Sequence, residues 1–167
     1  MLPHMSVQIR DFRSDDTAAV NRIALAAWAE YRPAFSDWAR STVRLARAAH
    51  FAKEAELLVA EDNELVVGFV SYVAPGRDRE DIFEPSWALI RLLSVDPVSR
   101  GRGIGRALSE ASIERARRDG ASVMALHATP VMSVALGMYL RMGFMHTREI
   151  PERNGLPYAV YTLRLGS

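Results

Sequence analysis

The feature that most constrains this chain is a glycine-rich run at residues 100–106, which reads Arg-Gly-Arg-Gly-Ile-Gly-Arg. It lies between an apolar segment that predicts a strand and an amphipathic segment that predicts a helix. Three glycines in five residues permit a tight turn and let a ligand approach the backbone closely. Amides at the start of a helix point outward and favour an anion. The run therefore predicts a phosphate or pyrophosphate site, to which Arg100, Arg102 and Arg106 add positive charge.

Two common phosphate-binding motifs do not fit this run. A Walker loop requires Gly-Lys-Ser/Thr, and the run contains no lysine. A dinucleotide fingerprint requires G-x-G-x-x-G, but counting from Gly101 puts Arg106 at the third glycine, and counting from Gly103 puts Leu108 there. For the run taken alone, an ordinary strand–helix turn with solvated arginines remains an alternative.

Hydrophobic periodicity and turn residues predict eleven elements along the chain. The expected strands are Val7–Phe12, Leu57–Glu61, Leu65–Val73, Trp87–Val95, Ala121–His127, Phe144–Ile150 and Tyr158–Leu165. The expected helices are one from Ser14 to a break at Pro33, one over Ser36–His50, one from Ile104 to Asp119-Gly120, and one between Val131 and Met142. Hairpin turns are expected at Asp62-Asn63 and Asn154-Gly155. The order β-α-α-β-β-β-α-β-α-β-β indicates an α/β domain in which helices flank a mixed sheet.

Composition limits the class of protein. The 167 residues are 49% hydrophobic and 25% charged, which predicts one soluble globular domain over 1–167 with its core over about 7–165. A net charge of +1 argues against binding to nucleic acid or to an anionic membrane. The absence of cysteine excludes disulfides, thiolate metal sites and an acetyl-cysteine intermediate, and no metal site is expected. Met1–Arg10 does not resemble a signal peptide and no run of about 18 apolar residues exists, so we expect a cytoplasmic protein.

Three stretches resemble the GNAT family of N-acetyltransferases. Residues 100–105 resemble its Q/R-x-x-G-x-G/A signature, and residues 92–97, Leu-Leu-Ser-Val-Asp-Pro, resemble its fourth strand and the exit from it. Residues 135–144 resemble its A-x-x-x-Y-x-x-x-G-F segment. The element order also matches from Val7 to Leu165. The resemblance implies the acyl-CoA N-acyltransferase fold, with a mostly antiparallel sheet.

The resemblance also implies a co-substrate, acetyl-CoA, and roles for particular residues. The pantetheine arm would pair with the backbone of Leu93, Ser94 and Val95. The pyrophosphate would lie on the amides of the turn formed by Arg100, Gly101, Arg102, Gly103, Ile104, Gly105 and Arg106. Tyr139 would act as a general acid that protonates the leaving thiolate. The alternative for Tyr139 is a core aromatic at helical spacing.

The sequence departs from the family pattern at two places. Met132 stands where the family often has Asn, and Leu89 and Ile90 stand where a strand-four Glu is common. The usual general base is therefore missing. His127, Glu80, Asp81, Glu84 and water remain candidates. Packing at a strand end is the alternative for the histidine, and a solvated loop is the alternative for the three acids.

The implied reaction is direct transfer of an acetyl group to an amine of a small molecule or a peptide. Four aromatic residues and a proline at the junction of the first two helices would shape the acceptor pocket, or merely pack a helix corner: Trp28, Tyr31, Pro33, Phe35 and Trp38. Arg32, Arg40 and Arg77 are candidates for recognising a carboxylate. A non-catalytic acyl-CoA sensor and a protein or peptide acetyltransferase remain alternatives, and a homodimer is left open.

Overall fold

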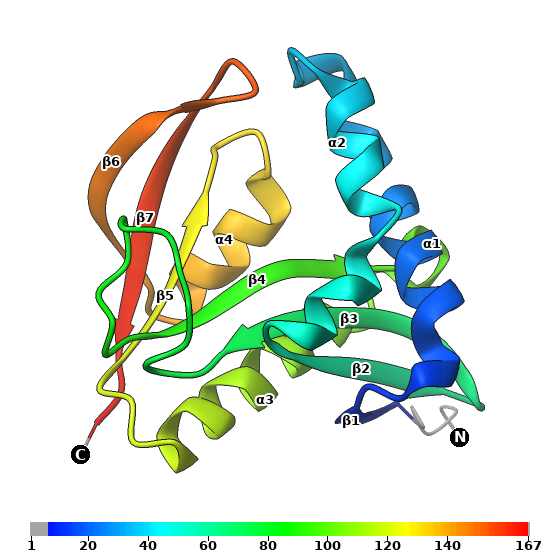
Figure 1. The fold of residues 1–167 in the computed structure, drawn as a ribbon, viewed down its shortest axis with the longest axis horizontal. Helices are drawn as coiled ribbons and strands as arrows, with labels where there is room; N and C mark the ends of the chain where they lie inside the picture. Colours follow the sequence, from blue (N-terminus) through cyan, green and yellow to red (C-terminus); the bar gives the residue numbers. More distant parts are fainter. Residues whose placement is uncertain (1–6, 167) are drawn as a thin grey trace.

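A seven-stranded sheet organises residues 7–166, the part of the chain that the computed structural model describes (Figure 1). Its strand order is β1-β2-β3-β4-β5-β7-β6. The strands are β1 Gln8–Asp11, β2 Glu56–Asp62, β3 Leu65–Val73, β4 Ala88–Val95, β5 Val123–Ala128, β6 Met145–Arg153 and β7 Leu156–Arg164. Only β4 and β5 pair in parallel within this described sheet, and the other neighbours are antiparallel. The predicted fold class, a mostly antiparallel sheet with flanking helices, is confirmed.

Helices cover both faces of the sheet (Figure 1). They are α1 Thr17–Trp28, α2 Trp38–Leu45, α3 Ile104–Arg118 and α4 Ser133–Arg141, with short 3-10 segments at Ser14–Asp16, Ala29–Ala34, Ala48–Lys53 and Pro97–Ser99. Successive side chains of β2 point to opposite faces. Leu57 therefore packs in the cluster that contains Ile23 of α1, whereas Leu58 packs in the cluster that contains Leu108 of α3. No helix within residues 7–166 is long and apolar enough to cross a membrane.

Several predicted boundaries differ from the observed ones. The helix expected over Ser36–His50 ends at Leu45, and a separate 3-10 segment follows from Ala48. The side chain of Asn21 on α1 accepts a hydrogen bond from the Ala49 amide at 2.8 Å, which ties this second segment to α1. Pro33 does not break α1, because α1 already ends at Trp28. The prediction for Met1–Arg10 falls mostly on residues 1–6, outside the described residues.

The last hairpin shows why one turn prediction was accurate. Asn154 and Gly155 have φ of 53° and 74°, the left-handed pair that a two-residue hairpin turn requires. At the first hairpin the left-handed pair is Asn63-Glu64, with φ of 49° and 68°, one residue later than predicted.

The centre of the sheet opens between β4 and β5. Among the described residues these strands pair at two positions only, Ala88 with Met124 and Leu89 with Ala125. Figure 1 shows β4 crossing the molecule while β5 and β7 rise away from it. Beyond this point β4 carries a bulge opposite β3, at which Leu92 has a φ of 52°. The parallel pairing and the bulge together leave one edge of the second half of β4 facing open space.

Candidate functional site

The larger of two cavities follows the open edge of β4 and the glycine-rich turn. Its volume is about 720 Å³. Nine of the ten residues predicted to bind the co-substrate line it: Leu93, Ser94, Val95, Arg100, Gly101, Gly103, Ile104, Gly105 and Arg106. The tenth, Arg102, does not line it in the described structure. We call this space the donor cavity. Side chains from α4 and from the end of α1 complete its walls.

The turn has the backbone geometry of an anion site. Gly101 and Gly103 have φ of 79° and 76°, a conformation that costs a residue with a side chain about 1–2 kcal/mol. Gly103 is the N-cap of the fifteen-residue helix α3. A Cβ atom built on either glycine would have no neighbour within 4 Å among the described atoms, so the backbone faces open space. The free amides and the positive end of the helix dipole favour a phosphate at this place.

The arginines of the turn do not point freely into the donor cavity. Arg100 pairs with Glu30 at 2.9 Å and donates to the carbonyl of Ala27. Arg102 pairs with Asp62 at 2.9 Å, and Arg106 pairs with Glu110 at 2.8 Å. A carboxylate partly neutralises each guanidinium. The backbone amides of the turn are therefore the principal hydrogen-bond donors to an anion bound there.

A smaller cavity of about 170 Å³ adjoins the first. Trp28, Leu93, Met132 and Ala135 line both cavities, so the two spaces meet beside the bulge of β4. Its apolar wall comprises Phe35, Leu45, Ile90, Leu126, Ala128 and Tyr158. We call it the acceptor cavity. Of the aromatic cluster at the first helix junction, Trp28 and Phe35 reach this space, while Tyr31 lines the donor cavity.

Tyr139 lies on α4 and lines the acceptor cavity. It is 5% exposed and packs edge-on against Phe144, with 5.4 Å between ring centroids. Burial raises the pKa of its phenol above the ordinary range, and a hydrogen-bonding interaction with Ser109 opposes that shift. The phenol is therefore protonated at neutral pH, as a proton donor must be.

His127 lies near the end of β5, between Leu126 and Ala128, and all three residues line the acceptor cavity. Its ring lies between Phe83 and Tyr158, with centroid distances of 5.9 and 5.6 Å, and its buried Nδ1 has no hydrogen-bond partner among the described residues. Burial, and next the positive charge of Arg153, lower the pKa of His127 to about 4. This value is below the ordinary histidine pKa of about 6.5, which weakens His127 as a candidate base. The imidazole lines the acceptor cavity as a neutral group.

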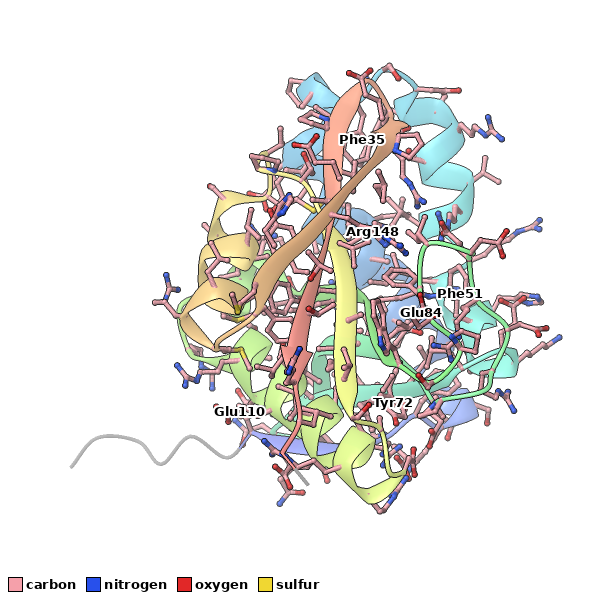
Figure 2. The ribbon with its side chains drawn as sticks, turned by 90° about the vertical axis from the view of Figure 1, so that its left-hand side faces the viewer. Phe35, Phe51, Tyr72, Glu84, Glu110 and Arg148 are labelled. Carbon is pink, nitrogen blue, oxygen red and sulfur yellow. The ribbon has the colours of Figure 1, made fainter. Side chains whose placement is uncertain are left out.

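The three acidic residues considered as general bases do not line the acceptor cavity in the described structure. Glu80 forms an ion pair with Arg153, which lowers the pKa of Glu80 and weakens it as a base. Asp81 and Glu84 are exposed on the loop before β4 (Figure 2) and line neither cavity in the described structure.

The three arginines considered for recognising a carboxylate do not line the acceptor cavity in the described structure. Arg32 and Arg40 are exposed and do not line it in the described structure, and Arg77 donates to the Glu54 carbonyl at 3.2 Å. The arginines that line it are Arg44, Arg91 and Arg153. One signal for them was present, since Arg91 is the single charge within the apolar strand Trp87–Val95. Within residues 7–166 no group of three His, Asp or Glu side chains is placed to hold a metal ion.

Comparison with known proteins identifies the family. The Acetyltransferase (GNAT) family profile matches residues 20–144, three quarters of the chain. The chain belongs to the GNAT family. This GNAT protein is 28% identical over 141 residues to a mycothiol acetyltransferase from Geodermatophilus obscurus, a match that covers 83% of the chain and 44% of the relative. It thus spans less than half the length of that relative.

Solved structures share the fold of this GNAT protein. A putative acetyltransferase from Salmonella typhimurium, determined with acetyl-CoA, superposes with a TM-score of 0.69 at 24% identity and covers 96% of this chain and 95% of its own. An N-acetyltransferase from Thermoplasma acidophilum in complex with coenzyme A gives a TM-score of 0.75 at 17% identity, covering 96% of this chain and 100% of its own.

Proposed function

We propose that this GNAT protein transfers an acetyl group from acetyl-CoA directly to an amine. The observation that supports this most is the junction of the two cavities at Trp28, Leu93, Met132 and Ala135. A donor held along β4 and an acceptor held beside Tyr139 would meet there without a covalent enzyme intermediate. The acetyltransferase and coenzyme A complexes among its relatives agree with this function.

The donor cavity offers one binding region for the pantetheine arm of acetyl-CoA and another for its pyrophosphate. The unpaired edge of β4, over Leu93, Ser94 and Val95, offers backbone groups to the amides of the pantetheine arm. The glycines of the turn expose amides to the pyrophosphate. A backbone donor on β4 would also polarise the thioester carbonyl, a contribution that grows as negative charge develops on that oxygen. Acetyl-CoA itself supplies the activated acetyl group.

In the proposed reaction the amine nitrogen bonds to the thioester carbonyl carbon and the carbon–sulfur bond breaks. Tyr139 donates its phenolic proton to the departing sulfur, and it is reprotonated from solvent in the next cycle. The amine's own protons pass to water. His127 is a weak acceptor for them, because moving a proton from an amine of pKa about 10 to an imidazole of pKa about 4 costs about 8 kcal/mol.

The arginines around the acceptor cavity assist this step. Positive charge nearby disfavours an ammonium ion and therefore lowers the pKa of a bound amine. Arg44, Arg91 and Arg153 would favour the neutral amine, which is the nucleophilic form. The cavity thus reduces the need for the strand-four glutamate that this sequence lacks.

An assay of thiol release by the purified protein, with acetyl-CoA and a panel of amines, amino acids and short peptides, tests this function. We expect amine-dependent release of coenzyme A and an acetylated product of matching mass. Binding of acetyl-CoA without turnover on any acceptor would instead support a sensor. Turnover confined to peptides would support a peptide acetyltransferase.

A further inference from the structure

Three arginines from distant parts of the chain line the acceptor cavity. Arg44 comes from α2, Arg91 from β4 and Arg153 from the end of β6. Most other lining residues are apolar. Arg91 and Arg153 are half-buried beside this apolar wall and lose hydration, which proteins normally compensate with an opposite charge, whereas Arg44 is exposed. The partners of these three arginines therefore indicate what the cavity is built to receive.

Two of the three arginines form no ion pair with a carboxylate in the part of the chain that the structure describes. Arg153 pairs with Glu80. Arg44 and Arg91 instead lie over the same ring, that of Phe51, with their guanidinium carbons 5.5 and 5.4 Å from its centroid. Figure 2 places Phe51 on the segment between α2 and β2. No carboxylate among residues 7–166 forms an ion pair with either, and a cation–π contact leaves both positive charges in place.

The two arginines also repel each other. Burial, and after it the charge of Arg44, lowers the pKa of Arg91, and the charges of Glu80 and Glu54 oppose this shift. The lining of the described cavity includes three arginines, a neutral His127 and no Asp or Glu. Glu80 pairs with Arg153, and Glu54 acts on Arg91 from outside the lining. An anionic ligand would remove this repulsion.

We propose that the acceptor is a free amino acid, whose carboxylate is bound by Arg44 and Arg91 while its amine faces the thioester. This inference rests on the proposed function. A guanidinium presents a planar fork that matches a carboxylate. Arg91 stands two residues before Leu93, on the other side of the bulge at Leu92, and so lies close along the chain to the place where the two cavities meet. That spacing suits a small amino acid whose two functional groups are close together, and a cavity of about 170 Å³ suits its size.

The test compares matched acceptors with the intact protein. The standard L-amino acids would be assayed beside their carboxamides and their decarboxylated amines, which share each side chain but lack the negative charge. We expect kcat/KM for the preferred free acid to exceed that for its carboxamide by roughly 10- to 100-fold, the range of a charged hydrogen bond.

Three single variants locate the effect. Arg44→Met and Arg91→Met should each lower kcat/KM for the free acid by roughly 10- to 100-fold more than that for the carboxamide, because only the free acid loses a carboxylate contact while both acceptors lose the charge that favours the neutral amine. Arg40→Met is the matched control, since Arg40 lies one turn earlier on α2, is exposed and does not line the described cavity. Its kcat/KM should equal that of the wild type. Arg91→Met should also keep or raise the melting temperature, because it removes a repulsion.

The outcomes distinguish a failure of this inference from a failure of the proposed function. Equal turnover of acids and carboxamides, or acetylation only of amines without a carboxylate, would overturn the amino acid acceptor while acetyl transfer stands. A lower melting temperature of Arg91→Met with unaltered acid selectivity would assign Arg91 to the fold and overturn the inference as well. No turnover of any amine, despite acetyl-CoA binding, would overturn the proposed function and this inference with it.

Discussion

The indole nitrogen of Trp28 donates a hydrogen bond to the hydroxyl of Ser94, 3.1 Å away. The same hydroxyl donates to the carbonyl of Leu92 at 3.0 Å. Leu92 is the bulge residue of β4 and has a positive φ, a strained conformation for a branched side chain. These two hydrogen bonds connect α1 to the bulge of β4, at the place where the donor and acceptor cavities meet.

Ser94→Ala should therefore damage both stability and binding of acetyl-CoA. The indole N–H would lose its acceptor and the Leu92 carbonyl would lose its donor, so we expect a loss of about 1–3 kcal/mol in the free energy of unfolding. Urea denaturation measures this loss, and calorimetry should show weaker acetyl-CoA binding. Ser122→Ala, at an exposed serine after α3, is the control and should change neither quantity. Wild-type affinity in Ser94→Ala would show that the bulge persists without the hydroxyl.

Gly103 and Gly120 allow strain to be separated from ligand approach. Their φ values are 76° and 77°, and a Cβ atom on either would meet no described atom within 4 Å. Alanine at either position should thus cost about 1–2 kcal/mol of stability. Gly103 lines the donor cavity and Gly120 does not line it in the described structure. Only Gly103→Ala should weaken acetyl-CoA binding, and Gly103→Val should abolish the thermal shift that acetyl-CoA gives. Equal affinities in the two alanine variants would exclude a close approach at Gly103.

Tyr139→Phe tests the proposed proton donor. Loss of the phenol should lower kcat by roughly 10²-fold or more, because the thiolate would leave without general acid assistance. The dissociation constant of acetyl-CoA should change little, since Tyr139 lines the acceptor cavity and not the donor cavity in the described structure. Tyr161→Phe, a buried tyrosine of β7 that lines neither described cavity, should retain wild-type kcat. Wild-type turnover of Tyr139→Phe would assign its ring to packing alone.

The features that the sequence predicted share a local origin. The turn at 100–106, helix α3 and the hairpin at Asn154-Gly155 are each specified by neighbouring residues, through glycine conformation and helical spacing. The boundary between α2 and the next 3-10 segment was not predicted, because it depends on a hydrogen bond from Ala49 to Asn21, 28 residues away. Local patterns do not contain contacts of that range.

The acceptor cavity was the least predictable part of the site. Arg44, Arg91 and Arg153 are separated by dozens of residues and converge only through the sheet order. The partners of Arg100 and Arg102, Glu30 and Asp62, lie on other elements, so the sequence suggested free cations where the fold forms ion pairs.

His127 should make the fold sensitive to acid. Its pKa of about 4 in the folded protein lies below the value of about 6.5 expected in the unfolded chain. Between these values the unfolded chain binds the additional proton, so stability is fully present above pH 6.5 and declines as the pH falls toward 4. A difference of about 2.5 pH units corresponds to about 3 kcal/mol. Urea denaturation at intervals from pH 4 to pH 8 would measure this decline.

The His127→Phe variant isolates the contribution of this one residue from that of the carboxylates. Phenylalanine retains the ring packing with Phe83 and Tyr158 and carries no proton. Its free energy of unfolding should therefore fall by about 3 kcal/mol less than that of the wild type between pH 6.5 and pH 4. NMR titration of the His127 imidazole provides a direct check, and a midpoint near 6.5 would contradict the burial on which the prediction depends. The same low pKa predicts that kcat/KM of His127→Phe keeps the pH dependence of the wild type above pH 5, because this histidine does not accept the proton of the amine.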